Sequence, residues 1–242
     1  MYYTLKKLTL YLLLLYPLYS QVSNGGNPKS IQEGLIDDMP KIIMPKVDRD
    51  ALLREDEIEM AKDVPYRFGT PFEVQYNLDN SGVWEEVSEG RIWRLSIHSE
   101  DAYSIGLVYD NFIIPDGATL YIYNQDNIIL GGYTSANNAN TFSTPQLSGD
   151  ICTLEYYESA STEESVVNIN INRIIHDYKD FYNMINNRDE CGTNVVCPEA
   201  DPYEDEINSA AHLDMGGWIC SGGMLNNTSN DLTPYFLTAN HC

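Results

Sequence analysis

The residues best suited to chemistry lie in the last ten positions of the 242-residue chain. An apolar run, Tyr235-Phe-Leu237, predicts a buried strand that leads directly into Thr238-Ala-Asn-His-Cys242. A histidine held beside a hydroxyl can take its proton and later return it to a leaving group, so His241 is a candidate general base. Cys242 follows at once, and Cys220 stands one strand and one polar hairpin earlier, in Cys220-Ser-Gly-Gly.

This arrangement resembles the trypsin-like serine peptidases, whose general base is the histidine of a Thr-Ala-Ala-His-Cys segment. It is more similar still to the lysyl-endopeptidase branch, because Cys191-Gly-Thr-Asn-Val-Val-Cys197 resembles the mature N-terminus there and Asn226-Asn-Thr-Ser-Asn-Asp231 resembles its hairpin. The resemblance implies that His241 is the catalytic base and that Cys220 and Cys242 are paired in a disulfide. It further implies a secreted endopeptidase that cleaves protein or peptide substrates after Lys or Arg.

The other parts of such an active site are expected beyond residue 242. The acid that orients the histidine, the serine nucleophile and the specificity pocket of the family would all follow Cys242. The resemblance therefore implies a protease precursor that is truncated after His241 and is inactive as given. Asn240 departs from the family pattern, which usually has alanine there, and a small polar residue should be tolerated at this position.

The other cysteines carry weaker signals, and their total of five is odd. Cys191 and Cys197 would enclose only a short loop if they were bonded to each other, and the resemblance instead implies partners beyond Cys242. Cys152 lies in a strand-like segment and is predicted to be a buried thiol.

A zinc site is a conceivable alternative use of the C-terminal cysteines and histidines. Such a site would lack the paired Cys-x-x-Cys spacing typical of structural zinc and would lie in an oxidising compartment, so no metal or cofactor is expected. Its ligands would be His212, Cys220, His241 and Cys242. Away from His241 no motif surrounds the histidines, and we expect them at the surface or in the core: His98, His176 and His212.

Residues 1–20 have the layout of a secretory signal peptide. Lys6 and Lys7 form a positive start, an apolar stretch follows over 8–15, and Ser20 is a small residue suited to the cleavage site. The apolar stretch is short for a membrane span, which needs about 20 apolar residues, although an uncleaved N-terminal anchor is the alternative. The pattern predicts a secreted protein with no membrane attachment after signal removal.

The charge of the chain limits its partners. The formal net charge is -22, and nucleic-acid binding draws on Lys and Arg to neutralise phosphates, so nucleic acid is excluded as a partner. Arg188 is the last Lys or Arg in the sequence, whereas Asp and Glu continue to occur after it. This change coincides with the appearance of cysteines and predicts a linker over residues 177–190.

Residues 65–176 contain short strand-like segments with turn signals between them, at spacings of about 8–12 residues, a pattern typical of an antiparallel β-sandwich. Val167, Ile169 and Ile171 alternate and should share one face. Tyr121 and Tyr123 also alternate, which favours packing or cross-strand pairing over the alternative of a sugar-binding platform.

A leader over residues 21–64 should precede this module. Residues 21–46 show no sustained period and predict irregular chain. Residues 48–62 predict a short helix with Asp48 as its N-cap. The helix should dock by a narrow apolar stripe that includes Leu52 and Met60.

The upstream module also carries a resemblance, because Tyr66-Arg-Phe-Gly69 and Trp93-Arg-Leu95 are similar to segments of lysyl-endopeptidase propeptides. The expected fold class is therefore mainly β: an antiparallel β-sandwich prosegment, then the first strands of a trypsin-like β-barrel domain in residues 191–242. The prosegment would act on the protease domain in cis, by assisting its folding or by blocking its site. Activation would cut the linker, with Arg188-Asp189 as the preferred bond and Lys179-Asp180 as the second choice.

A different class of function stays open. The β-sandwich could itself be the working part, as a secreted binding or adhesion module that carries a degenerate protease remnant.

Overall fold

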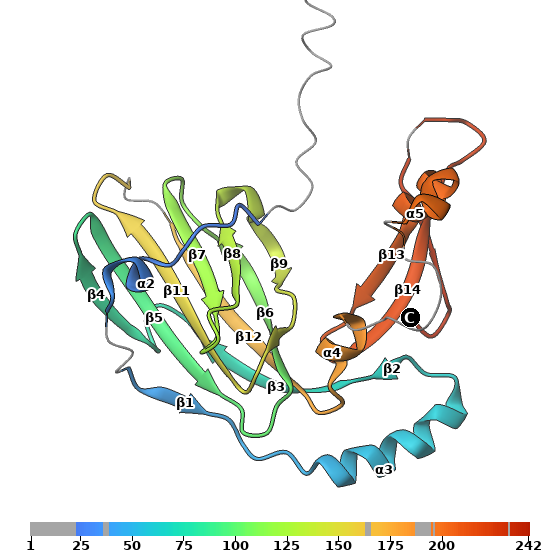
Figure 1. The fold of residues 1–242 in the computed structure, drawn as a ribbon, viewed down its shortest axis with the longest axis horizontal. Coiled ribbons are helices and arrows are strands. Elements are labelled where there is room, and N and C mark those ends of the chain that lie inside the picture. Colours follow the sequence, from blue (N-terminus) through green and yellow to red (C-terminus); the bar gives the residue numbers. More distant parts are fainter. Residues whose placement is uncertain (1–22, 36–38, 163–165, 187–194, 196, 232) are drawn as a thin grey trace, which may run out of the picture.

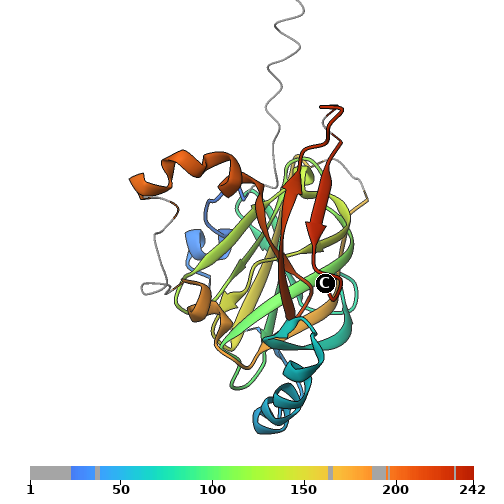
Figure 2. The ribbon, with the colours of Figure 1, turned by 90° about the vertical axis from the view of Figure 1, so that its right-hand side faces the viewer.

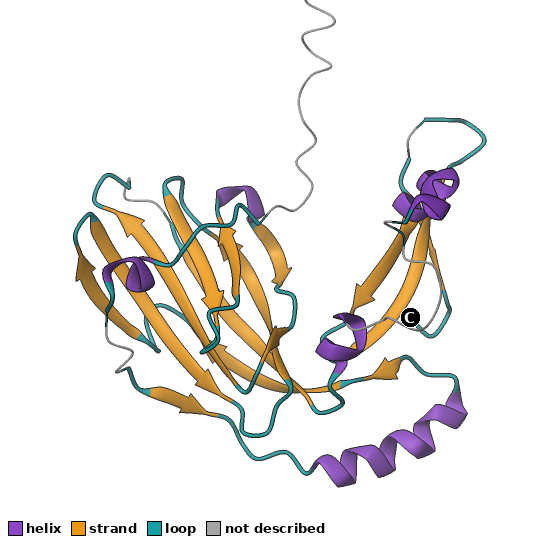
Figure 3. Cartoon of the chain, in the orientation of Figure 1, coloured by secondary structure: helices purple, strands orange, loops and turns teal. Residues whose placement is uncertain are grey.

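The computed structural model describes residues 23–35, 39–162, 166–186, 195, 197–231 and 233–242. Its ribbon shows a large body of two sheets with a smaller sheet standing beside it, near which the chain ends (Figure 1). The described helices are short and lie outside the sheets (Figure 3). The predicted mainly β, antiparallel fold class is confirmed, and the described strands close no barrel.

The larger body is a β-sandwich. Its first sheet has the strand order β1-β5-β11-β7-β8 with β4 beside β5, and its second has the order β10-β6-β12-β3 with β9 beside β6. The first sheet consists of β1 (Lys41–Ile43), β4 (Val83–Val87), β5 (Gly90–His98), β7 (Ala118–Tyr123), β8 (Ile129–Tyr133) and β11 (Ile151–Ser159). The second consists of β3 (Gly69–Tyr76), β6 (Ser104–Ile113), β9 (Ala139–Ser143), β10 (Leu147–Ser148) and β12 (Asn168–Asp177).

One hydrophobic core lies between the two sheets, because successive side chains of a strand point to opposite faces. Trp93 and Leu95 of β5 meet Ile169 and Ile171 of β12 in a single buried cluster, and Val167 packs against it as its spacing predicted. Cys152 is fully buried in the same cluster as a free thiol, which confirms the prediction, and burial raises its pKa to about 12.

Residues 23–35 and 39–44 contact the sandwich and include regular structure, whereas the sequence predicted irregular chain there. Strand β1 pairs in parallel with β5, and helix α2 (Lys29–Glu33) lies over the outer face of the first sheet. There the backbone N–H of Ser30 donates to the buried carboxylate of Glu155 at 3.2 Å, and its hydroxyl lies 3.1 Å from that of Tyr123. The segment supplies the partners that these buried polar groups need. Tyr123 is therefore covered by the leader, which favours packing over a sugar platform.

Helix α3 (Arg49–Glu59) and the short 3-10 helix η1 (Met60–Lys62) occupy the range predicted to be helical. The side chain of Asp48 accepts a hydrogen bond from the Ala51 N–H at 2.9 Å, so it caps the helix as predicted. The predicted apolar docking stripe holds only in part: Leu52 is half-buried, but Met60 is 76% exposed, and the buried residue of α3 is the acidic Asp56. Asp56 is buried because it forms ion pairs with Arg67 and Lys179.

The C-terminal part forms a separate small sheet with the order β13-β14-β15, to which β2 adds (Figure 2). Strand β15 was predicted to be buried, but its side chains are exposed, because it is an edge strand that no described element covers. The predicted linker contains a helix, α4. The elements are β2 (Tyr66–Arg67), α4 (Phe181–Asn186), η3 (Pro198–Tyr203), α5 (Glu204–Ser209), β13 (Ala210–Asp214), β14 (Trp218–Leu225) and β15 (Tyr235–Thr238).

In the described part of the chain, no helix is both long enough and apolar enough to cross a membrane. The predicted signal peptide, with Ser20 at its cleavage site, lies outside the described residues.

Candidate functional site

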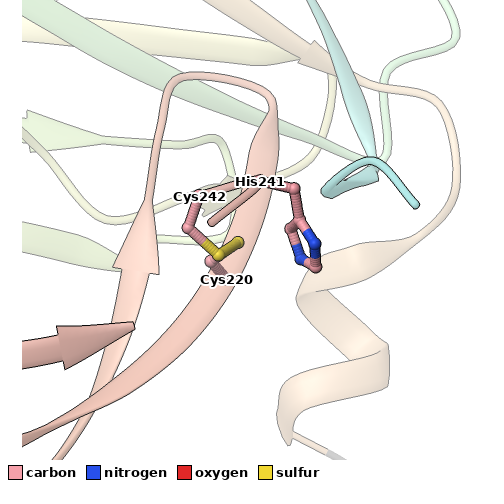
Figure 4. Close-up of side chains that lie close together, drawn as sticks. All are labelled: Cys220, His241 and Cys242. Carbon is pink, nitrogen blue, oxygen red and sulfur yellow. A yellow bond between two sulfur atoms is a disulfide. The ribbon is translucent and has the colours of Figure 1, made fainter. Parts of the chain in front are cut away.

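His241 lies in a tight turn that follows β15, where the Cys242 N–H donates to the Ala239 carbonyl at 3.0 Å. The structure joins Cys220 of β14 to Cys242 by a disulfide with a Cα–Cα distance of 6.1 Å, the pairing that the resemblance implied. Figure 4 shows the imidazole and the disulfide leaving this turn in different directions. The disulfide thus ties the turn to β14 and leaves the imidazole of His241 free to act on other groups.

The Cys-Ser-Gly-Gly motif explains how β15 reaches its place on β14. Gly222 pairs with Thr238, whose hydroxyl donates to the Ser221 carbonyl at 2.9 Å. A Cβ atom at Gly222 would lie 2.5 Å from both the Leu237 carbonyl oxygen and the Phe236 ring, so only glycine allows the two strands this approach. The glycine therefore lets β15 run on to the turn that carries His241.

The imidazole of His241 contacts an acid that lies 178 residues earlier in the chain (241 minus 63). Its Nδ1 lies 3.2 Å from Oδ1 of Asp63, which follows η1 and has a left-handed backbone with φ of +52°. Asp63 is 92% exposed and His241 31% exposed, so solvent screens the pair and it contributes little to stability. Its value is orientation: a carboxylate on Nδ1 leaves Nε2 as the nitrogen that can accept a proton.

A cleft of about 780 Å³ lies in front of His241 and is lined also by Tyr66, His212, Ile219 and Ser221. Within the part of the chain that the structure describes, no hydroxyl is hydrogen-bonded to the imidazole. The site can therefore position a proton acceptor beside an open cleft, but the described residues do not place a nucleophile on it.

The candidate zinc set is brought together in part. Cys220, His241 and Cys242 place their ligand atoms within 4.8 Å of one another. The two sulfur atoms are bonded to each other, however, so neither is available as the thiolate that zinc binds. His212 is exposed and stacks on the ring of Phe181, with 5.8 Å between the ring centroids.

The structure separates the other predicted residues from this site. Cys197 is a free, half-buried thiol, whereas Cys191 and Arg188 lie outside the described residues. His176 is buried in the sandwich and bonded to the Ser99 hydroxyl at 2.7 Å, and burial lowers its pKa. His98 pairs with Asp150 at the surface of the sandwich.

Sequence reasoning missed the residues that link the sandwich to this site. Strand β2 pairs with β14, so that Arg67 lies opposite Trp218 and Tyr66 opposite Ile219. Asp63 then reaches His241 because it lies just before this strand. No local pattern reveals such a pairing, although a short aromatic and basic segment between Pro65 and Gly69 would have been a reason to look for one.

A comparison with known families gives one match to this region. A family model described as "Lysyl endopeptidase, C-terminal domain" matches residues 185–242. The match begins in the predicted linker and includes Cys220, His241 and Cys242. It supports a protein related to lysyl endopeptidases, and the β-sandwich lies outside the matched residues.

Proposed function

We propose that this chain belongs to the precursor of a secreted serine endopeptidase in which His241 is the general base. The observation that carries the proposal is the position of this histidine inside the matched segment. It follows a strand directly, is tied to the neighbouring strand by the Cys220–Cys242 disulfide, and faces a cleft.

In this reaction His241 would take the proton of a serine hydroxyl as that oxygen attacks a peptide carbonyl, and would return it to the leaving amine. A carboxylate on Nδ1 holds the imidazole in the tautomer that this step needs, with Nε2 directed at the hydroxyl. The serine nucleophile, and the acid that orients the histidine in the active enzyme, would come from residues beyond Cys242. Residues 1–242 alone are therefore expected to be inactive.

The proposed substrates are proteins or peptides cut after Lys or Arg. This preference is proposed from the lysyl endopeptidase match. The absence of Lys and Arg after Arg188 fits such an enzyme, because this stretch offers its own product no cut site.

The sandwich would be the prosegment that acts in cis. Its support is contact between the two parts: β2 pairs with β14, and Phe68 and Ile219 belong to one apolar cluster. Activation would cut the linker. The second-choice bond is disfavoured, because the Lys179 side chain is 11% exposed with its Nζ 2.6 Å from Asp56, and a protease must extract that side chain. Arg188-Asp189 remains our proposed bond.

The test uses the full-length secreted protein and a lysyl ester substrate. We expect hydrolysis, and we expect His241→Ala to reduce kcat by about 10³-fold or more without loss of folding. The matched control is His98→Ala, a surface histidine outside the site, which should retain activity. Full activity of His241→Ala would overturn the assignment of the base.

One observation favours the second function, a binding module. The sandwich has a polar cleft of about 560 Å³, and beside it Asn111 adopts a left-handed backbone within β6, with φ of +48°. Strained backbone often accompanies ligand sites. The lining of this cleft includes Asn77, Asp79, Trp84, Arg91, Asp110 and Asn168. An aromatic ring among amides and carboxylates suits a small sugar.

An array of immobilised glycans tests this second function. Binding that Trp84→Ala abolishes and that Tyr235→Ala, an exposed aromatic of β15, leaves intact would favour the module. An array without binding would eliminate this sugar-binding form of the second function.

A further inference from the structure

The edge of β14 is shared by two strands that lie end to end. β15 pairs with residues 222–225 of β14 and β2 with residues 218–219, while β13 occupies the opposite edge. β15 and β2 both run antiparallel to β14. β2 therefore pairs with the part of this edge that β15 does not reach. The gap between them holds Cys220 and Ser221, and the turn of His241 lies there. We call residues 63–68 the docking strand.

Backbone contacts extend the pairing beyond β2. The N–H groups of Phe68 and Gly69 both donate to the Gly217 carbonyl, at 2.9 and 3.0 Å. The chains approach so closely that a Cβ atom at Gly217 would lie 2.7 Å from the Gly69 carbonyl oxygen, and Gly217 has a φ of +108°. Only glycine meets both conditions without strain.

The docking strand is held on the sandwich by a cluster of buried polar groups around Asp56, which we call the latch. The carboxylate of Asp56 accepts from Arg67 Nε at 2.7 Å and from the Tyr178 hydroxyl at 2.7 Å, and Lys179 Nζ lies 2.6 Å from it. Burial alone would raise the pKa of Asp56, but these hydrogen bonds outweigh it and lower the pKa. The latch therefore joins α3, β2 and the segment after β12.

Aromatic contacts reinforce the same attachment. Lys179 Nζ lies 4.5 Å from the centre of the Tyr66 ring, and the rings of Phe68 and Phe181 stack with 4.3 Å between centroids. Tyr66 thus makes a charged contact with the segment after β12 and Arg67 one with α3, while their backbones pair with β14. A strand added to an open sheet edge supplies backbone hydrogen bonds that the edge otherwise lacks.

We propose that the docking strand is the element by which the sandwich both completes the edge of β14 and covers His241, and that the latch controls it. With the latch closed, Asp63 stays on His241 and Tyr66 lines its cleft. With the latch open, the docking strand leaves β14, Asp63 leaves Nδ1, and the imidazole becomes more exposed than its present 31%. The role of His241 in this statement rests on the proposed function, whereas the strand and its latch do not.

The experiment measures hydrogen exchange and histidine modification in the complete chain. Asp56→Asn removes the charge that Arg67, Tyr178 and Lys179 share, so amide exchange in residues 217–221 should rise about ten-fold or more, as expected for local opening. Carbethoxylation of His241 should accelerate in parallel. The control is Glu55→Gln, because Glu55 is an exposed partner of Arg67 at 3.2 Å, and it should change neither rate.

A second variant acts from the opposite side and leaves the latch untouched. Gly217→Ala should also raise exchange in residues 217–221 and the modification rate of His241, while β11 and β12 keep their protection. If Asp56→Asn unfolds the sandwich as a whole, this variant decides the matter. Unchanged exchange and modification in Gly217→Ala would overturn the docking strand, and unchanged rates in a folded Asp56→Asn would overturn the latch. Neither readout requires catalysis, so either result is independent of the protease assignment.

Discussion

The sandwich and the C-terminal sheet are both antiparallel, but they are stabilised in different ways. In the sandwich two sheets face each other over a core in which residues such as Trp93 and Leu154 are fully buried. In the C-terminal sheet the side chains of β15 are all exposed. Besides its pairing with β13 and β15, β14 is held by the docking strand, one apolar cluster and a disulfide. The first part can account for its own stability, whereas the second depends on the first.

Removal of a large side chain should affect the two parts very differently. Trp93→Ala should lower the free energy of unfolding by about 3–5 kcal/mol, because it empties a packed core and removes a hydrogen bond to the Ser81 carbonyl. Leu237→Ala in β15, at 61% exposure, should cost about 0.5 kcal/mol or less. Chemical denaturation measures both, and similar losses would contradict the contrast.

Reduction of the Cys220–Cys242 disulfide should come next in size. The bridge spans a sequence separation of 22, and closing a loop of that length stabilises by about 3 kcal/mol. Exchange in β14 and β15 should therefore increase after treatment with a reductant, whereas β5 and β11 keep their protection. An equal response in the sandwich would show that the two parts unfold together.

Acid should weaken the contact between the two parts before it affects the core. The pKa of Asp56 is lowered in the folded chain, so its contribution is present above the ordinary value of 3.8 and is lost as the pH falls through the folded value. Exchange in residues 217–221, corrected for the intrinsic rate, should rise in this range. Asp56→Asn should remove the dependence, and a variant that keeps it would assign it to another group.

The smallest effect should come from Asp63→Asn. Asp63 is 92% exposed, so loss of its charge should leave the thermal midpoint unchanged. The modification rate of His241 should still rise, because its Nδ1 loses a partner. A lowered midpoint would show that this exposed pair supports the C-terminal sheet more than its solvent exposure indicates.

The parts of the fold that follow a local period could be predicted from the sequence. Val167, Ile169 and Ile171 alternate, and they face the core as expected. The helix cap at Asp48 was also predictable, because its side chain bonds a backbone N–H only three residues later, that of Ala51. Likewise, the motif around Cys220 and Cys242 indicated a pair that the structure forms.

The parts that depend on distant partners were not predictable. Asp56 sits in an acid-rich helix that resembles any solvated helix, and only Arg67, Tyr178 and Lys179 make it a buried group. The exposure of β15 likewise depends on what packs on it, which its apolar residues Tyr235–Leu237 do not reveal. The contact between Asp63 and His241 joins residues that are far apart in the sequence, and no spacing in the sequence encodes it.

The helix that carries Ser30 has a consequence for the order of folding. Its partner Glu155 lies 125 residues later, so helix α2 cannot find its place until nearly the whole sandwich has been synthesised. Contacts of such high sequence separation slow folding, because a long loop must close before they form. Helix α2 therefore stays undocked while the strands of the first sheet pair with one another. Its docking would be among the last events in the sandwich, and would signal that β11 is in register.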